Sequence, residues 1–217
     1  MKIDREQWAT EQIFEQSWWD DCRNTFGEQA KHVTYARKMG MVPFNDGGRW
    51  PLLNTHGLKI LDIGGGPVSM LLECVGLDRG VVVDPCNYPQ WTRDRYESVG
   101  IELCKWPAED FEPDEVFDEV WCYNVLQHTA DPEAIVQMMR RAAKLIRIFE
   151  WVDMPSSPGH PHELDPRTLE QWLVGDRGLD IPHEWLWTDD MFWDVRLSNE
   201  DVTWAGKALY GYVRTGL

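Results

Sequence analysis

The sequence predicts an α/β fold built on a doubly wound, parallel sheet with helices on both faces. Short apolar runs of strand length alternate with helical stretches through the middle of the chain. Three consecutive glycines, Gly64 to Gly66, directly follow the first run, and Asp84 closes the second. A glycine-rich first loop and an acid after the second strand are typical of sheets that bind a nucleotide at the carboxyl ends of their strands.

The N-terminal residues 1–57 predict a helical cap followed by a linker. Apolar side chains recur at helical spacing over residues 5–40, and Gly40 is suited to the position that ends the last turn. These apolar positions are Phe14, Trp18, Cys22, Tyr35 and Met39. Residues 45–57 are rich in turn formers and predict a surface connection. We assign the cap to the same domain as residues 58–217.

Five apolar runs predict the parallel strands of the sheet, at residues 59–63, 80–85, 101–104, 117–125 and 145–150. The segments between them predict helices over residues 67–76, 89–100 and 131–144. Pro132 is suited to the first turn of the last of these helices.

The C-terminal third begins with a loop and predicts a helix over residues 166–174, with Asp165 as its N-cap. Two runs of β type follow, at residues 191–198 and 208–215. We expect them to form an antiparallel edge of the sheet.

The composition is that of one globular domain without a membrane span. The chain has 217 residues, of which 43% are hydrophobic and 27% charged. No apolar run approaches the roughly 18 residues that a bilayer span needs, and the N-terminus lacks the apolar core of a secretory signal. The five cysteines form no C-x-x-C pair, which favours a reducing cytoplasm over a disulfide framework or a zinc site. The net charge of -16 disfavours a nucleic-acid partner.

The glycines and the acid suggest how a ligand is held. A strand that turns at once into a helix exposes backbone N–H groups, and Gly64 and Gly66 leave them unshielded by a Cβ atom. Asp84 comes 20 residues after Gly64, at the place where a carboxylate binds both ribose hydroxyls of an adenosine cofactor. The alternatives are that the glycines serve chain reversal alone and that Asp84 only starts a turn before Pro85.

The same segment distinguishes between cofactors. A dinucleotide site requires a third glycine for close helix packing, and this chain has Ser69 at that position. Asp62, in the last turn of the first strand, is poorly placed beside a pyrophosphate and well placed near a cation. These features favour S-adenosyl-L-methionine, which carries a positive sulfonium and an ammonium group.

Four segments in this order resemble the successive motifs of class I S-adenosylmethionine-dependent methyltransferases: LDIGGGPVS, VVVDP, PAEDF and FDEVWCYNVLQHTADP. The similarity spans residues 58 to about 153. It implies a Rossmann-like sheet of seven strands, mostly parallel with one antiparallel strand. It also implies S-adenosyl-L-methionine as cofactor and S-adenosyl-L-homocysteine as product.

The resemblance gives each matched position a role. The glycines would lie under the methionine part of the cofactor, with Asp62 near its amino group, either directly or through water. Asp84 would hold the ribose, Ala108 and Glu109 would meet the adenine edge, and backbone groups after the fourth strand would line the ligand. The implied cofactor-binding residues are Asp62, Gly64, Gly65, Gly66, Asp84, Pro85, Ala108, Glu109, Asn124 and Val125.

Three histidines are candidates for a general base, which is needed only if the acceptor atom carries a proton. His128 follows the fourth strand, and His160 and His162 follow the fifth. The alternatives are a structural role for His128 in the following turn and a solvated loop for the other two.

No metal site is predicted. The His160 and His162 pair lies beside acids, but Asn124 and Gln127 stand where metal-dependent quinone-pathway O-methyltransferases carry carboxylates. Hard-cation binding is therefore not expected.

The predicted function is methyl transfer from S-adenosylmethionine to a small-molecule or sugar-type acceptor, with O-methylation slightly favoured over N-methylation. Nine of the 13 tryptophans lie in the flanking segments, where they either roof a pocket for an aromatic or cationic acceptor or pack the flanking helices onto the sheet. Two alternatives remain: an NAD(P)-dependent oxidoreductase, and a non-catalytic partner subunit that binds S-adenosylmethionine.

Overall fold

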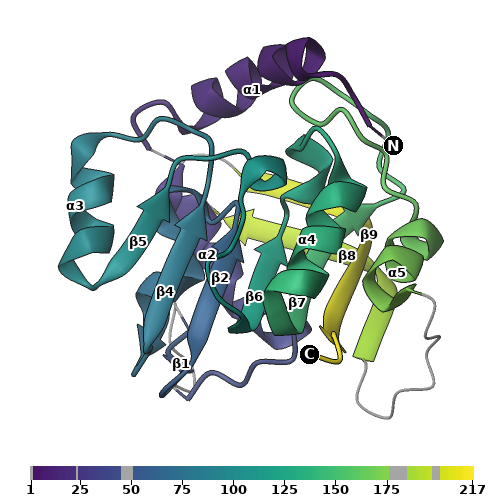
Figure 1. The fold of residues 1–217 in the computed structure, drawn as a ribbon. Helices are drawn as coiled ribbons and strands as arrows, with labels where there is room; N and C mark the ends of the chain where they lie inside the picture. The colour runs from purple at the N-terminus through teal and green to yellow at the C-terminus, as the bar shows by residue number, and fades with distance from the viewer. Residues whose placement is uncertain (1, 23, 45–50, 176–184, 197–200) are drawn as a thin grey trace.

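In the computed structural model, seven strands form one twisted sheet with helices on both faces (Figure 1). The structure describes residues 2–22, 24–44, 51–175, 185–196 and 201–217. In spatial order the strands are β5 (Ile101–Cys104), β4 (Arg79–Val83), β2 (Lys59–Ile63), β6 (Phe117–Tyr123), β7 (Ala143–Val152), β9 (Asp201–Arg214) and β8 (Trp185–Arg196). Strand β9 is antiparallel to both of its neighbours, β7 and β8, whereas the five strands from β5 to β7 in this order are mutually parallel. The predicted Rossmann-like fold is confirmed.

The helices divide between the two faces because side chains of a strand point alternately to either side. The α-helices are α1 (Arg5–Trp19), α2 (Thr25–Lys38), α3 (Gln90–Ser98), α4 (Pro132–Ala142) and α5 (Pro166–Val174). Leu61 and Ile63 of β2 pack in a core cluster with α4 and α5, whereas Ile60 packs in a second cluster with α2 and α3. Helix α1 lies across the top of the sheet, over the ends of the strands (Figure 1).

The predicted helix over residues 67–76 is wrong. The structure has two short 3-10 turns there, η1 (Gly66–Val68) and η2 (Met70–Glu73). Ser69 separates them with an extended backbone, and its side chain caps η2 by accepting from the N–H of Leu71. Side chains also take up the N–H groups that a helix would use, since Ser69 donates to Tyr96 and Met70 donates to Tyr123.

The N-terminal cap is helical, as its pattern predicts, and consists of α1 and α2. The apolar positions of α1 are not buried, however: Phe14 is 50% exposed and Trp18 is 51% exposed. The prediction holds for α2, where Tyr35 and Met39 lie fully in the core and Gly40 ends the helix with φ of 75°. Within the predicted linker, β1 (Leu53–Asn54) pairs with β3 (Cys74–Val75) in a small separate sheet.

The predicted N-termini of the later helices are confirmed, whereas α4 ends two residues before the predicted 144 because β7 begins at Ala143. Asp165 caps α5 by accepting from the N–H of Thr168 at 2.7 Å, and Pro132 opens α4. Among the described residues, no helix combines the length and the apolar character that a bilayer span requires.

Trp121 on the central strand β6 provides a test of the packing. Its side chain is fully buried, so Trp121→Ala should lower the free energy of unfolding by about 3 to 5 kcal/mol through the cavity it leaves. Urea unfolding followed by circular dichroism measures this change. The matched control is Trp106→Ala, whose side chain is 56% exposed and whose replacement should change stability by about 0.5 kcal/mol or less.

Candidate active site

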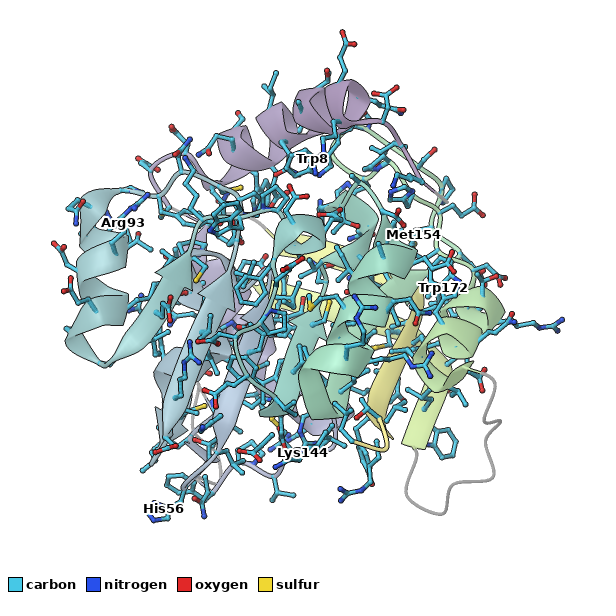
Figure 2. All side chains as sticks on the ribbon, in the orientation of Figure 1. Trp8, His56, Arg93, Lys144, Met154 and Trp172 are labelled. Carbon is cyan, nitrogen blue, oxygen red and sulfur yellow. The ribbon has the colours of Figure 1, made fainter. Side chains whose placement is uncertain are left out.

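One cavity of about 500 Å³ lies at the carboxyl ends of β2, β4 and β6, beneath α1 and beside α2. Figure 2 shows Trp8 beneath α1, directed toward the body of the protein. The predicted site residues that line the cavity are Gly64, Gly65, Asp84, Pro85, Ala108, Glu109, Asn124, Val125, His128 and His160. Asp62, Gly66 and His162 are outside its lining.

The three glycines are required by close packing as well as by backbone conformation. Gly64 and Gly66 have φ of 67° and 62°, in the left-handed region that disfavours other residues. A Cβ atom on Gly64 would lie 2.5 Å from Val125, and one on Gly65 would lie 2.5 Å from the Asp62 carboxylate. The loop therefore follows a path that side chains would obstruct at each of these positions.

Asp62 is a buried support beneath this loop. Its Oδ2 accepts hydrogen bonds from the hydroxyls of Ser69 and Tyr123, whereas Oδ1 has no partner among the described residues. Burial raises the pKa of Asp62 to about 7, against the lowering effect of the two hydroxyl donors. The side chain thus fixes the loop from below, in a position that leaves one acceptor oxygen unused.

Asp84 links the second strand to the glycine loop. Its Oδ2 accepts from the N–H of Gly66 at 3.1 Å, and its Oδ1 accepts from the N–H of Cys86 and the hydroxyl of Tyr88. Burial raises the pKa of Asp84 above its usual range, opposed by these donors. Because each carboxylate oxygen has two lone pairs, Asp84 retains acceptor capacity toward the cavity that it lines.

Glu150 at the end of β7 organises the third loop, a role that the sequence analysis missed. Its carboxylate accepts from the backbone N–H groups of Val125 and Leu126, at 3.0 and 3.1 Å. Asn124 just before them has φ of 60°, so the carboxylate holds a turn in a conformation that most residues avoid. Burial raises the pKa of Glu150 to about 7, against the effect of these backbone donors.

Ala108 and Glu109 lie together in the short turn after β5, as part of the cavity wall. One carboxylate oxygen of Glu109 accepts from the N–H groups of Ala130 and Asp131. Glu109 therefore fastens two loops to each other beside the position that the resemblance assigns to the adenine.

His128 and His160 meet inside the cavity, with ring centroids 4.4 Å apart. His128 Nδ1 lies 2.7 Å from the carbonyl oxygen of Gly159, and because a carbonyl only accepts, Nδ1 carries the proton. Nε2 is then the unprotonated nitrogen. Burial lowers the pKa of His128 to about 4, so its imidazole is neutral around neutral pH.

His162 is placed differently from the other two. It is 2% exposed, outside the cavity lining, and its Nε2 lies 2.8 Å from the carbonyl oxygen of Thr129. This geometry gives His162 a position behind the loop that carries His128 rather than one facing a ligand.

Polar side chains attach α1 to the rim of the cavity. Trp8 and Gln12 both donate to the carbonyl oxygen of His128, at 3.2 and 3.1 Å. Trp19 donates to Glu15 at 2.7 Å and lies against Gly66, where an added Cβ would approach its ring to 3.3 Å. These contacts make α1 the roof of the cavity.

Comparison with known proteins identifies the sheet and its loops. Residues 61–145 match the family model of a methyltransferase domain. The chain carries a class I S-adenosylmethionine-dependent methyltransferase domain. No curated protein sequence matches the chain significantly.

Solved structures share the fold of this methyltransferase over nearly its whole length. One is a complex between the Haloferax volcanii Trm112 methyltransferase activator and a putative methyltransferase, with 16% identity, a TM-score of 0.60, and coverage of 96% of this chain and 98% of the matched chain. Another is a possible histamine N-methyltransferase from Thermotoga maritima, with 12% identity, a TM-score of 0.60, and coverage of 96% and 99%. A third, the DhpI–SAH complex, has 14% identity, a TM-score of 0.56, and coverage of 96% and 98%.

The matched proteins also differ in length. The chain spans 53% of the [4+2]-cyclase SpnF, whose TM-score of 0.48 is too low to support a comparison. At the identities found, the solved structures establish the fold of this methyltransferase.

The cavity fits S-adenosylmethionine, the cofactor of such domains. Bare backbone at Gly64 and Gly65, the buried carboxylate of Asp84 and the backbone of Asn124 all face one space. Besides three histidines, the lining carries the carboxyl groups of four acidic residues and one ammonium group: Glu15, Glu28, Asp84, Glu109 and Lys31. An acidic lining suits a ligand with net positive charge. No group of three or more potential metal ligands occurs within the part of the chain that the structure describes.

Gly66→Ala tests the close-packed loop. The substitution forces an L-residue into φ of 62° and places a Cβ 3.3 Å from the Trp19 ring, so cofactor affinity should fall by about 10-fold or more. Calorimetric titration with S-adenosylhomocysteine measures it. Gly57→Ala is the control, because φ is 75° there and nothing lies within 4 Å. Equal affinities in the two variants would contradict a specific role for Gly66.

Glu150 should make stability depend on pH. Its folded-state pKa of about 7 exceeds the usual 4.5, so the native state binds this proton more tightly than the unfolded chain. The stabilisation is therefore full below about pH 4.5 and is lost as the pH rises through about 7. Glu150→Gln cannot titrate, so its unfolding free energy should decline less over this range than that of the wild type. Urea unfolding at several pH values measures the difference, and parallel curves would refute the assignment.

Proposed function

We propose that this methyltransferase acts on a small-molecule acceptor bound between the glycine loop and the roof formed by α1 and α2. The observation that carries the proposal is a single cavity that holds both the cofactor cradle and a separate histidine-lined wall. Residues 1–57 belong to the same domain in this proposal, because α1 and α2 close the cavity from above and from the side.

The residues of this chain contribute to the reaction mainly by positioning the cofactor and the acceptor. Methyl transfer is an in-line displacement, and an enzyme promotes it chiefly through alignment and exclusion of water. The bound cofactor supplies an activated methyl group on a sulfonium. Gly64, Gly65 and Asp84 would hold it at the ends of β2 and β4, with the backbone at Asn124 and Val125 beside it. Trp19 and Trp8 line the same cavity.

The acceptor side is defined by aromatic rings and imidazoles. His128 directs an unprotonated Nε2 away from its bond to Gly159, which makes it a hydrogen-bond acceptor for a hydroxyl or amine. His160 stacks beside it and completes the wall. Trp18 and Tyr35 add aromatic surface to the same cavity. We propose an oxygen or nitrogen acceptor atom on a small, sugar-like or aromatic molecule, with oxygen slightly favoured.

The two alternative functions are supported to different degrees. A nicotinamide-dependent oxidoreductase receives no support, since the family match is to a methyltransferase domain and the third glycine is replaced. A partner-dependent role has one observation in its favour, the fold shared with a chain solved together with a methyltransferase activator. Activity that appears only after addition of a second protein would favour that alternative.

Histidine substitutions test the acceptor side. His128→Gln removes the imidazole that faces the cavity and should raise the KM for the acceptor by about 5-fold or more through loss of one hydrogen bond. His162→Gln, behind the loop, should leave KM within about 2-fold. The assay measures release of S-adenosylhomocysteine with a panel of phenols, sugars and amines. Equal KM values for His128→Gln and the wild type would contradict this proposal.

A further inference from the structure

A third imidazole lines the cavity, from α2, and it is paired with a carboxylate. His32 Nδ1 lies 2.9 Å from Oε1 of Glu73, the last residue of η2. The two side chains are 3% and 8% exposed. Neither residue belongs to the motifs of the cofactor site, and they come from segments 41 positions apart.

The pair has a defined orientation. His32 lines the cavity and Glu73 does not, so Nδ1 is bonded to a group outside the lining and Nε2 lies on the opposite edge of the ring. A carboxylate on Nδ1 fixes the proton there and leaves Nε2 as the basic nitrogen. The bond to Glu73 is the one hydrogen bond of this ring among the described residues, which leaves Nε2 as the ring atom available to a ligand.

The position of the ring is also fixed. His32 packs edge to face against Tyr123, with centroids 6.2 Å apart, and the Tyr123 hydroxyl is held by Asp62. Helix α2 packs on η1, the turn that contains Gly66. The imidazole therefore lies beside the cofactor loop on a rigid element, which is the arrangement that a general base needs.

We propose that His32 is the general base of methyl transfer and that Glu73 is the positioning residue that orients it; this inference rests on the proposed function. His32 Nε2 takes the proton from the O–H or N–H of the acceptor. The freed electron pair forms the bond to the methyl carbon, and the carbon–sulfur bond breaks with its pair left on sulfur. The positive charge lost by the sulfonium reappears on the imidazolium, next to the Glu73 carboxylate.

His128 is less suited to this task. Its Nδ1 is bonded to a neutral carbonyl, and the nearest carboxylate, Glu15, is 3.4 Å away. The Glu15 carboxylate is thus a longer contact to an Nδ1 that already donates to Gly159. Glu73 bonds directly to Nδ1 of His32 at 2.9 Å, and its second oxygen, Oε2, has no hydrogen bond within the described structure. His128 thus binds the acceptor, and His32 removes its proton.

The first experiment needs no known acceptor. Diethyl pyrocarbonate modifies neutral, accessible imidazoles, and peptide mass spectrometry locates the sites. His32 should be modified in the free protein through the cavity that it lines, and protected by S-adenosylhomocysteine bound in that cavity. Exposed His56, at the far end of the molecule from α1 (Figure 2), should react in both states, whereas His162, which is as buried as His32 but outside the cavity lining, should not. An unreactive His32 beside a reactive His56 would overturn the proposal.

The second experiment measures turnover with an acceptor from the panel described above. His32→Gln should lower kcat by about 100-fold or more and leave S-adenosylhomocysteine affinity within about 2-fold. Glu73→Gln keeps a hydrogen-bond acceptor without the charge, so kcat should fall less and the low-pH limb of the rate profile should move. Exposed Glu133→Gln is the matched control and should change neither.

The pH profile must be interpreted against every charged or titratable group near His32. These groups are Glu73 from η2, Tyr123 from β6, and Lys31 with its ion-pair partner Glu28 on α2. An unchanged kcat and an unchanged profile in His32→Gln would refute the base. If the wild type binds S-adenosylhomocysteine but methylates no acceptor in the panel, the proposed function fails while the modification result still decides the orientation of His32.

Discussion

Buried carboxylates at the carboxyl edge of the sheet hold the loops on which the site depends. Asp62, Asp84 and Glu150 stand near the carboxyl ends of strands. Each accepts a hydrogen bond from a loop that follows its own strand or a neighbouring one. All three are at most 6% exposed. Parallel strands bring these positions to one edge of the sheet. The hydrogen bonds of the three carboxylates therefore hold together loops from distant parts of the chain around one cavity.

This design has an electrostatic consequence. Burial raises the pKa of each of the three carboxyl groups, because it removes the water that would stabilise the ionised form. Hydrogen-bond donors of the protein must take the place of that water. The donors present are backbone N–H groups and hydroxyls, which carry only partial charge. A positive ligand in the cavity adds the attraction that these donors lack, so the same residues that set the loop conformations also favour a sulfonium cofactor over an anionic one.

The sequence predicted features that local signals determine. The strand at residues 59–63 and the helix at residues 166–174 were predicted to the residue, because an apolar run and an N-cap define them. The helix predicted over residues 67–76 does not form, because N–H groups of this segment bond to Tyr96 and Tyr123, which lie far along the chain. For the same reason periodicity gave no sign of the bond between His32 and Glu73.

The two helices of the N-terminal cap are attached to the sheet in different ways. Helix α1 has no buried residue, and it is joined to the rim by side chains such as Gln12 and Gln16, which bond to backbone groups of the loops. Water can replace such bonds at little net cost, in contrast to the apolar contacts that hold α2 in the core. The helix that carries His32 is therefore held by the core, whereas the helix that roofs the cavity is held by exchangeable polar contacts.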